Sequence, residues 1–416
     1  MSRQLLFWGI FLLVLLAEAY GYTAVRTALA PASLAARRGL ALGYWVFTLG
    51  VWGLFFWAAN TRHVGNVSLK SYLLALPIIL LTAKLVVLLP LLLEDAVRLG
   101  RWAAGSRPAA ASAATGAGLS RSEFVSRLAL GLGLVPLAAM LWGVARGKTD
   151  YQVRRRTLRY PNLPAAFEGF KILQISDLHT GSFGGNLEPL QRAVALINAQ
   201  QADLIVMTGD LVNDRATEVE PHIPTLAGIR SPQGLPIFSI LGNHDYGDYV
   251  HWPSPEAKRA NLQRLQANHA RIGWRLLLDE AHTIRRGDAE LAVLGVQNWS
   301  SHPNFPKHGN LARAHAQSGN APFKVLLSHD PSHWEAQVLN YPDIDLMLAG
   351  HTHGMQFGLN LPHLQWSPVQ YSYPQWAGTY EQGRQRLYVN VGLGYLGIPM
   401  RVGFLPEITL IELRRA

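Results

Sequence analysis

The sequence predicts a chain of two parts, a helical transmembrane region followed by an α/β domain. Long apolar stretches are concentrated before residue 146. From residue 150 onward, short β-rich apolar runs alternate with helical segments such as 187–200 and 255–270, which is typical of α/β domains. We therefore expect a membrane anchor over 1–146 and a folded domain over 169–416. The stretch 147–168 between them is basic and carries two prolines, and it is predicted to be a linker.

Four stretches in the first part are long and apolar enough to cross a hydrocarbon layer of roughly 30 Å as helices. They cover about residues 5–22, 39–59, 71–93 and 125–144. The sequence thus predicts a four-helix anchor, and with it an integral membrane protein whose partner is the lipid bilayer.

The positive charge of the chain belongs to the membrane region. Residues 1–149 hold 14 of the 37 Lys and Arg and 4 of the 27 Asp and Glu, which leaves 23 of each for residues 150–416. The folded domain is therefore neutral and lacks the dense basic face that phosphate backbones require, so we expect no nucleic-acid partner. The chain has no cysteine, which excludes disulfides and thiolate metal sites.

The charges around the spans give conflicting indications of orientation. The loop over 98–127 is rich in Ala, Gly and Ser, carries five arginines and is expected to be cytoplasmic, which would place the folded domain outside. The basic run 154–156 after the last span favours the opposite orientation. The segment Ser120-Arg121-Ser122-Glu123-Phe124-Val125 resembles a twin-arginine export signal with one arginine replaced by serine, or it is only a polar start to a helix. We predict an extracytoplasmic folded domain.

Two charged residues lie deep within the predicted spans, Glu18 in the first and Lys84 in the third. The two helices run in the same direction, and the charges lie at similar depth. Because ionisable residues within a membrane are costly and usually find a partner, we predict that Glu18 and Lys84 form a pair that fixes helix packing. Snorkelling of Glu18 toward the nearer interface is the alternative.

The second part of the chain contains five short blocks of residues that commonly bind metals. Each block follows an apolar run that is expected to be a buried strand, and ligands at strand ends converge in space. The blocks are Asp177-Leu178-His179, Gly209-Asp210, Gly242-Asn243-His244-Asp245, Ser328-His329 and Gly350-His351-Thr352-His353. In the first and last blocks, alternation along the chain lets both metal-seeking side chains reach one ion. The glycines before the ligands are expected at sharp turns where a side chain would obstruct the approach.

Carboxylate oxygens, imidazole nitrogens and one amide oxygen suit divalent ions such as Mn, Fe or Zn. Five blocks in this order predict a site for two such ions. Unrelated loop residues and buried histidines are the alternative, but several spacings would then have to agree by accident. Histidines outside the blocks are expected to be surface or packing residues, except that His302 and His308 could line a substrate pocket.

The order of the blocks resembles the pattern D-x-H, G-D, G-N-H-D/E, H and G-H-x-H of the calcineurin-like metallophosphoesterases. The resemblance covers about residues 165–413 and implies a two-sheet αββα sandwich. The sequence departs from the family at Met355, where glycine is frequent, and this would alter the pocket wall beside the ions. Further positions resemble the membrane-anchored YkuE-like branch of the family, namely Gly392-Leu393-Gly394, Pro399, Arg401 and Pro406-Glu407-Ile408.

The family resemblance also implies a role for the residues of the blocks. The implied ligands are Asp177, His179 and His353 for the first ion, Asn243, His329 and His351 for the second, and Asp210 as a bridge. One carboxylate can hold two cations about 3.5 to 4 Å apart, and the hydroxide that they share is the implied nucleophile.

Two catalytic residues are predicted, His244 and Asp245. By the same resemblance, His244 points to the substrate, where it would stabilise developing charge or protonate the leaving oxygen. Asp245 is expected to accept a hydrogen bond from the other imidazole nitrogen and so to fix the ring. Arg401 could bind a substrate phosphate through two hydrogen bonds, or it could form a surface ion pair.

These observations predict a membrane-anchored, metal-dependent hydrolase of phosphate mono- or diesters. Aromatic residues near the blocks favour an amphiphilic or envelope-derived substrate, and lipid-linked phosphoesters belong to this class. Aromatic residues more often belong to the core, which is the alternative. These residues are Phe183, Trp252, Trp299, Phe305 and Phe357. The native metals, the substrate and the oligomeric state are left open by the sequence.

Three other functions are alternatives to this one. Related metallophosphoesterases hydrolyse the pyrophosphate bond of a nucleotide-linked lipid of the UDP-diacylglucosamine type. A non-catalytic metal-binding membrane scaffold would have no use for an oriented imidazole that binds no metal. A transporter is disfavoured because only Glu18 and Lys84 are charged deep within the spans.

Overall fold

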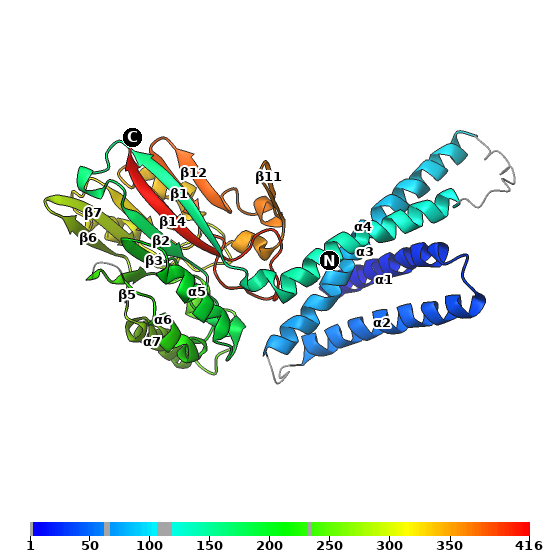
Figure 1. Ribbon diagram of the computed structural model, residues 1–416. Helices are drawn as coiled ribbons and strands as arrows, with labels where there is room; N and C mark the ends of the chain where they lie inside the picture. The colour runs from blue at the N-terminus through cyan, green and yellow to red at the C-terminus, as the bar shows by residue number, and fades with distance from the viewer. Residues whose placement is uncertain (1–2, 62–66, 106–118, 232–233) are drawn as a thin grey trace. The chain divides into compact units, whose positions relative to one another are not determined.

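The structure is a computed structural model that describes residues 3–61, 67–105, 119–231 and 234–416. The chain forms two compact units, a helical unit over Met1–Trp142 and a second unit over Gly143–Ala416. Figure 1 shows long helices in the first unit and sheets covered by helices in the second. The predicted fold class, a helical region followed by an α/β domain, is confirmed.

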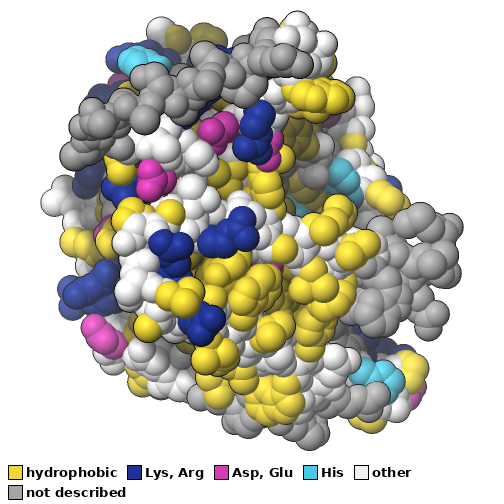
Figure 2. Space-filling view, turned by 90° about the vertical axis from the view of Figure 1, so that its right-hand side faces the viewer, with side chains coloured by type: hydrophobic (Ala, Val, Ile, Leu, Met, Phe, Trp, Pro, Cys, Tyr) yellow, Lys and Arg dark blue, Asp and Glu magenta, His cyan; other side chains and the backbone are white. Residues whose placement is uncertain are grey.

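Within the described residues, four long helices cover the four predicted spans. They are α1 (Arg3–Ala28), α2 (Leu34–Asn60), α3 (Val67–Ala103) and α4 (Arg121–Ala145), whose last residues belong to the second unit. Three segments of the described chain are long and apolar enough to cross a membrane, namely Leu34–Asn60, Leu69–Ala103 and Arg121–Thr149. Large apolar side chains on these helices are exposed, as expected where helices face lipid. Figure 2 shows a broad area of hydrophobic side chains beside several Lys and Arg side chains.

A buried ion pair joins α1 to α3. Glu18 is 1% exposed, and its carboxylate contacts the Lys84 ammonium. The same carboxylate accepts hydrogen bonds from the Tyr44 hydroxyl (3.1 Å) and the Trp52 indole N–H (3.4 Å), both in α2. The predicted pairing is confirmed, and the cluster ties three helices together because a carboxylate out of water needs such partners.

Two six-stranded sheets form the framework of the second unit. The first has the order β1 (Gln152–Tyr160), β14 (Glu407–Arg415), β2 (Lys171–Ile175), β3 (Leu204–Met207), β4 (Ile237–Ser239) and β5 (Trp274–Leu276). Strands β2 to β5 are parallel, and β14 is antiparallel to β2.

The second sheet has the order β12 (Gly378–Gln382), β13 (Gln385–Val389), β9 (Leu346–Ala349), β8 (Lys324–Leu327), β7 (Ala289–Gly295) and β6 (Glu280–Arg286). Its four central strands are parallel, and the edge strands β12 and β6 are antiparallel to their neighbours. Every residue of β3, β8 and β9 is buried, as expected for parallel strands covered on both faces.

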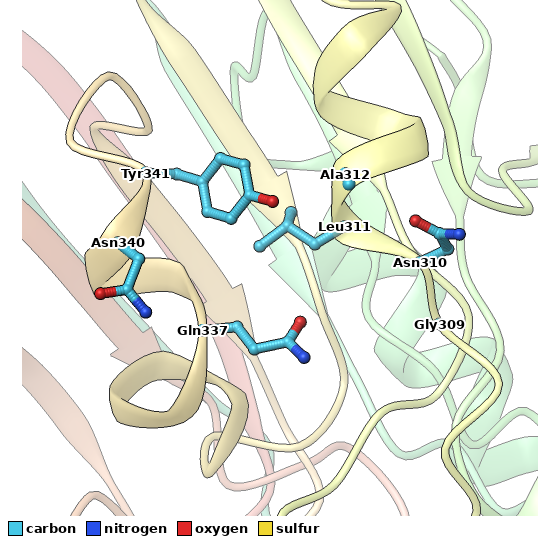
Figure 3. A pocket seen from close by; sticks show the side chains of 7 residues that line it. All are labelled: Gly309, Asn310, Leu311, Ala312, Gln337, Asn340 and Tyr341. Carbon is cyan, nitrogen blue, oxygen red and sulfur yellow. The ribbon is translucent and has the colours of Figure 1, made fainter.

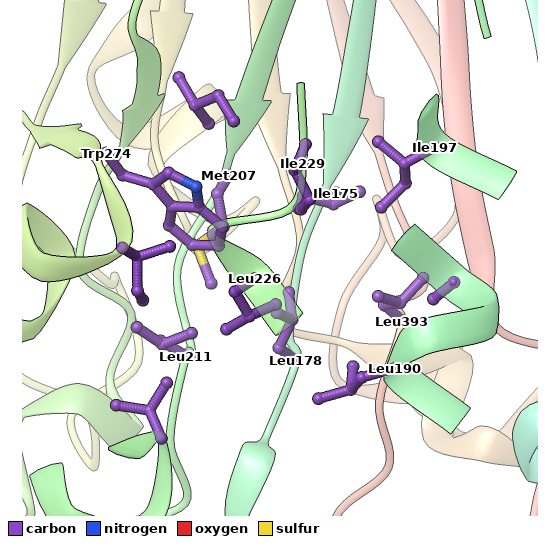
Figure 4. Close-up of a cluster of buried hydrophobic side chains, with 14 of the residues drawn as sticks. Ile175, Leu178, Leu190, Ile197, Met207, Leu211, Leu226, Ile229, Trp274 and Leu393 are labelled. Atoms are coloured by element: carbon purple, nitrogen blue, oxygen red, sulfur yellow. The ribbon is translucent and has the colours of Figure 1, made fainter. Parts of the chain in front are cut away.

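Three apolar clusters define four layers. The cluster between the sheets joins residues such as Val206 of the first sheet to Val325 of the second. A second cluster packs helices on the outer face of the first sheet, and Figure 4 shows part of it. These helices are α5 (Glu188–Asn198), α6 (Ile223–Leu226) and α7 (Pro255–Ile272). A third cluster packs α8 (Leu311–Ala316) and α9 (His333–Ala336) on the second sheet, which confirms the αββα sandwich.

The segment 147–168 is not only a linker, because it contains strand β1. This strand pairs in parallel with β14 along its whole length. Its last residues Leu158 and Tyr160 are buried, whereas Arg155 and Arg156 are exposed. Charged residues on an edge strand discourage pairing with another chain, so the basic run that suggested a linker serves the edge of the sheet instead.

Candidate metal centre

The five blocks lie at the carboxyl ends of strands in both sheets. Asp177, Asp210 and Asn243 follow β2, β3 and β4 of the first sheet, while His329 and His351 follow β8 and β9 of the second. Parallel strands end at a common edge, which is where α/β sheets bind their ligands. The topology therefore brings the blocks together, as predicted from the sequence.

Two groups of side chains at this edge could each hold a metal ion. Within each group the ligand atoms lie within 4.8 Å of one another. The first group is Asp177, His179 and His353, and the second is Asp210, His329 and His351. All six predicted carboxylate and imidazole ligands thus fall into one of the two groups.

Asp210 belongs to the second group and also faces a histidine of the first. Its Oδ2 atom is 3.1 Å from His329 Nε2 in the second group and 3.5 Å from His179 Nε2 in the first. The Asn243 Oδ1 atom is 3.2 Å from His329 Nε2 and 2.8 Å from His351 Nδ1. Asn243 is therefore beside the second group, and the Asp210 carboxylate lies near imidazoles of both groups.

The donor set of the first group fits a cation. The Nε2 atoms of His179 and His353 face each other at 3.0 Å, and His353 Nε2 is 3.2 Å from Asp177 Oδ1. The Nδ1 atom of His179 is buried without a hydrogen-bond partner among the described residues. Because facing nitrogen atoms beside a carboxylate are stabilised by a common positive charge, these residues suit a divalent metal ion.

The second group also stabilises positive charge, as the pKa values of His329 and Asp210 show. Burial would lower the pKa of His329, but the charge and hydrogen bond of Asp210 outweigh it and raise that pKa to about 10. Burial would raise the pKa of Asp210, but the charges of His329 and His244 hold it well below its ordinary value. Both shifts show that the carboxylates of this cluster stabilise nearby positive charge, which a bound metal ion would also supply.

Backbone strain is concentrated at the same residues. Among the described residues, eight other than glycine have positive φ angles, and five of these are predicted ligands. They are Asp177 (52°), His179 (46°), Asp210 (58°), His351 (73°) and His353 (53°). The left-handed conformation costs about 1 to 2 kcal/mol for a residue with a Cβ atom, and strain of this kind is typical of functional sites.

Two glycines allow the ligand loops to approach each other. A Cβ atom at Gly242 would collide with the Asp210 carboxylate, and one at Gly350 would collide with Ser176 and Asp177. The prediction that side chains at these turns would obstruct the ligands is confirmed.

Hydrogen bonds from outside the groups orient two of the imidazoles. His329 Nδ1 lies 2.7 Å from the Thr208 carbonyl, which leaves Nε2 to face the metal groups. His351 Nε2 lies 2.7 Å from the Tyr373 hydroxyl, which leaves Nδ1 to face them. The Tyr373 hydroxyl donates to Asp330 Oδ2 at 3.2 Å. Such partners fix the tautomer and the direction of a ligating ring.

Tyr373 and Asp330 are not among the residues predicted from the sequence. Asp330 directly follows His329, so a search of the neighbours of each ligand could have found it. Tyr373 lies beyond the last block and beyond the short strand β11 (Leu364–Trp366), and no local pattern marks it. Tyr249 was not predicted either, and its hydroxyl accepts a hydrogen bond from Asn243 Nδ2 at 2.8 Å.

His244 lies beside the first group and outside both. Its Nδ1 atom is 2.7 Å from the Asn213 carbonyl, and its backbone N–H donates to Asp210 Oδ1 at 2.9 Å. Its ring centroid is 5.0 Å from that of His179 and 4.5 Å from that of Tyr249. Since the carbonyl occupies Nδ1, the ring presents Nε2 for other interactions.

The predicted contact between Asp245 and the His244 ring is wrong, because Asn213 occupies that nitrogen. The Asp245 carboxylate instead accepts four backbone N–H groups at 2.9 to 3.2 Å, those of Asp210, Leu211, Val212 and Gly242. Consecutive residues of the 3-10 turn His244–Tyr246 point in different directions, which separates the two side chains. Burial and the charge of Asp210 raise the pKa of Asp245 to about 7. Asp245 is therefore a positioning residue for the loops after β3 and β4.

Both predicted roles of Arg401 are wrong. The side chain is fully buried, so it forms no surface ion pair. Its guanidinium donates to the carbonyls of Val391, Gly394 and Phe404 at 2.7 to 3.1 Å, and Nη2 lies 3.1 Å from His353 Nδ1. With its donors engaged by backbone, Arg401 supports the loop behind His353 and does not reach a substrate phosphate.

Aromatic side chains lie beside the second group. The Phe305 ring is 4.8 Å from the His351 ring, and the His302 ring is 4.5 Å from that of Tyr373. His308, the other proposed pocket residue, packs on Tyr246 at 4.3 Å. The loop after β7 thus brings Phe305 and His302 to the metal centre.

A cavity of about 500 Å³ lies elsewhere in the second unit (Figure 3). It is lined by Gly309, Asn310, Leu311, Ala312, Gln337, Asn340 and Tyr341. These lining residues, all of them described, include no charged side chain and no predicted ligand. The cavity is therefore not part of the metal centre.

Fold and site together define a metallophosphoesterase attached to a membrane region. Residues 170–355 match the family model described as calcineurin-like phosphoesterase. Residues 2–148 match the one described as probable calcineurin-like phosphoesterase, transmembrane domain. The chain belongs to the calcineurin-like metallophosphoesterase family, and it is a membrane protein and a metal-dependent phosphoric ester hydrolase.

Particular relatives agree with this assignment. The chain is 30% identical over 308 residues to the metallophosphoesterase YkuE of Bacillus subtilis (strain 168), across 71% of this chain and 98% of that one. It is 30% identical over 261 residues to a transmembrane protein with metallophosphoesterase domain from Bos taurus, across 61% of this chain and 55% of that one. It is 28% identical over 247 residues to the phosphodiesterase YaeI of Escherichia coli (strain K12), across 59% of this chain and 82% of that one. The predicted YkuE-like relationship is confirmed.

Proposed function

We propose that the chain hydrolyses phosphate mono- or diesters with two divalent cations, of manganese, iron or zinc. The proposed ligands are Asp177, His179 and His353 for one ion, Asn243, His329 and His351 for the other, and Asp210 for both. The observation that carries the proposal is the Asp210 Oδ2 atom, which faces an imidazole of each group at 3.1 and 3.5 Å. A carboxylate in that position can be shared between two ions.

The side chains around the ions would have separate tasks. When bound, the cations would neutralise phosphoryl charge and activate water near neutral pH. His244, held at Nδ1 by Asn213, would use Nε2 to stabilise charge on the phosphoryl group or to protonate the leaving oxygen. Asp245 would keep the ligand loops in place through its four N–H partners, and Tyr373 would orient His351.

We propose further that the substrate is amphiphilic or comes from the cell envelope. The membrane helices of the same chain keep the hydrolase at a bilayer, and Phe305 offers apolar surface beside His351. The activity can be tested with the full chain in lipid nanodiscs, freed of metal by a chelator and titrated with Mn, Fe or Zn. Hydrolysis of chromogenic mono- and diesters and of extracted membrane lipids should return as two ions bind per chain.

The same experiment separates the alternatives. Two bound ions without turnover of any phosphoester would favour the scaffold and contradict the proposed hydrolase. Cleavage of the pyrophosphate bond of a nucleotide-linked lipid, with little hydrolysis of simple esters, would assign the other enzymatic activity. Asp343→Asn serves as the control, because this carboxylate is paired with Lys324 outside the metal groups. This variant should keep the metal content and the activity of the parent.

We propose an extracytoplasmic position for the catalytic unit. The arginines at the adjoining ends of α3 and α4 support it, since basic loops are retained in the cytoplasm. Because the chain has no cysteine, a single cysteine at the exposed position Asp288 can be labelled with an impermeant maleimide on intact cells. A cysteine at Arg101 should react only after the cells are broken. The reverse pattern would place the hydrolase in the cytoplasm.

A further inference from the structure

A small hairpin of the catalytic unit has one apolar face. It consists of β10 (Leu359–Leu361) and β11 (Leu364–Trp366), which form a two-stranded antiparallel sheet of their own. Opposite residues of such a pair share a face, as do alternate residues of a strand. The register therefore places four apolar side chains on one face, those of Leu359, Leu361, Leu364 and Trp366.

The other face of the hairpin is polar. Asn360 is opposite Gln365, and the Gln365 amide donates to Asn360 Oδ1 at 2.9 Å. Strict alternation of this kind is typical of a strand pair that covers an apolar environment on one side and meets water on the other. The hairpin thus has the sequence pattern of a strand pair whose apolar face is buried.

The apolar face is nevertheless exposed. Leu359, Leu361 and Leu364 are 50, 54 and 52% exposed, and Tyr371 just after the hairpin is 78% exposed. The Trp366 indole N–H donates to the Tyr371 hydroxyl at 3.4 Å. Figure 1 draws β11 away from the two large sheets. Contiguous exposed apolar side chains mark an interaction surface.

Both ends of the hairpin are connected to the metal centre. Before it, the chain passes from the ligand His353 through Met355, which is exposed. After it, Ser367 donates a hydrogen bond to the Gly354 carbonyl at 2.9 Å, and Tyr373 contacts His351. Whatever the hairpin binds is therefore held next to the proposed ligands.

The root of the hairpin is packed on the end of a membrane helix. Phe357 forms a bridge with Val402, and the Gly358 N–H donates to the Val402 carbonyl at 3.0 Å. Arg401, the neighbour of Val402, donates its backbone N–H to the carbonyl of Gly143 in the last turn of α4 at 3.4 Å. The fit is tight, because a Cβ atom at Gly143 would be within 2.7 Å of Arg401 and Val402.

We propose that the apolar face of β10 and β11 binds the surface of a phospholipid bilayer. The occupant is assigned from three observations. The root contacts the last turn of α4, and the face carries no charge. The aromatic residue of the face is Trp366, and its indole N–H donates to the exposed Tyr371 hydroxyl beside it. Tryptophan and tyrosine are enriched where an apolar body meets lipid and a polar tip meets headgroups. Binding of the hairpin to the bilayer does not depend on the proposed function. Only its consequence does, namely that an amphiphilic phosphoester passes from the bilayer to the metal centre.

The absence of cysteine allows a direct test on the full chain. Single cysteines at Leu361, Leu364 and Gln365 would be labelled with an environment-sensitive fluorophore and reconstituted into vesicles of phosphatidylcholine and phosphatidylglycerol. Nitroxide-labelled phosphatidylcholine should quench the probes at Leu361 and Leu364 severalfold more than the probe at Gln365, which is exposed on the polar face. Equal quenching at the three positions, or blue-shifted emission at Leu361 without quenching by the lipid nitroxide, would overturn the proposal. The latter result would indicate a protein partner.

A second arm measures activity. Leu361→Asp combined with Leu364→Asp should leave hydrolysis of a soluble chromogenic ester unchanged and lower hydrolysis of a phosphoester lipid in the same vesicles by about tenfold or more, given the burial of two leucines. Gln365→Glu is the matched control on the other face. Equal rates of lipid hydrolysis in the double variant and the parent would count against bilayer binding. A parent that hydrolyses no ester would refute the proposed function, while the quenching experiment would still decide the role of the hairpin.

Discussion

The helical unit and the catalytic unit both bury carboxylates, but they compensate the charge differently. In the helical unit, Glu18 has an ammonium and two neutral hydrogen-bond donors from the chain itself. In the catalytic unit, Asp177 and Asp210 lie among imidazoles whose nitrogen atoms also face one another. The first arrangement is complete within the protein, whereas the second has the donor set of a site that could hold metal ions. The way in which a buried charge is compensated therefore distinguishes a structural pair from a binding centre.

The largest effect should come from removing the shared carboxylate. We expect Asp210→Asn to lower kcat for a chromogenic diester by about a thousandfold, because several kcal/mol of charge stabilisation are lost and each 1.4 kcal/mol is about a factor of ten. The number of metal ions bound per chain, measured by inductively coupled plasma mass spectrometry, should fall as well. Full activity with an unchanged metal content would remove Asp210 from its proposed role, and the centre would then resemble the self-sufficient pair of the helical unit.

The pair in the helical unit can be broken from one side. Lys84→Leu leaves Glu18 buried without its ammonium and should lower the free energy of unfolding by about 3 kcal/mol. Glu18→Gln in the same chain should restore most of that loss, since no charge is then left uncompensated. Unfolding of the full chain in detergent micelles measures both effects. Arg101→Leu, at an exposed position near the end of α3, is the control. Equal stability of Lys84→Leu and the parent would show that Glu18 does not depend on its ammonium partner.

A third variant separates chemistry from metal binding. We expect His244→Asn to lower kcat by about a hundredfold, the usual contribution of an acid or base catalyst, and to leave the metal content unchanged. His251→Asn is the matched control because His251 is exposed. Loss of metal from the His244 variant would show that the imidazole is a ligand after all.

The smallest effect concerns a histidine that is buried without any charge. His269 contacts Ser239 at 2.9 Å, and burial lowers its pKa to about 4. In the unfolded chain, His269 binds a proton near pH 6.5, whereas in the folded chain it stays neutral until about pH 4. The folding stability therefore falls as the pH drops from about 6.5 to 4. His269→Gln should remove about 2 kcal/mol of the loss between pH 7 and pH 5. Denaturant unfolding at the two pH values measures it, with exposed His363→Gln as control, and parallel curves for parent and variant would disprove the assignment.

Much of the fold and of the site could be predicted because both depend on local patterns. Apolar length defined the four long helices, three of which lie in described segments long and apolar enough to cross a membrane. Blocks after buried strands defined the residues that converge. The strand β1 was missed because a basic run on an edge strand has the composition of a linker. The pairing that makes it a strand involves β14, which is remote in sequence.

The directions of side chains were harder to predict than their proximity. Asp245 follows His244, yet it binds the backbone of the neighbouring loop. Arg401 has the chemistry of a phosphate ligand, and only its burial among carbonyl groups shows otherwise. Tyr373 reaches His351 from a distant segment, so no spacing rule could have marked it.

The position of β14 has a consequence for biosynthesis. This strand lies between β1 and β2 and pairs with both, although it is the last strand of the described chain to be made. The first sheet therefore stays open until the ribosome has passed residue 415, long after the membrane helices have emerged. Sheets that close through such distant pairing form slowly and expose edges meanwhile. Insertion of the anchor into the bilayer should thus precede completion of the hydrolase, and a chain released early would be a substrate for proteases.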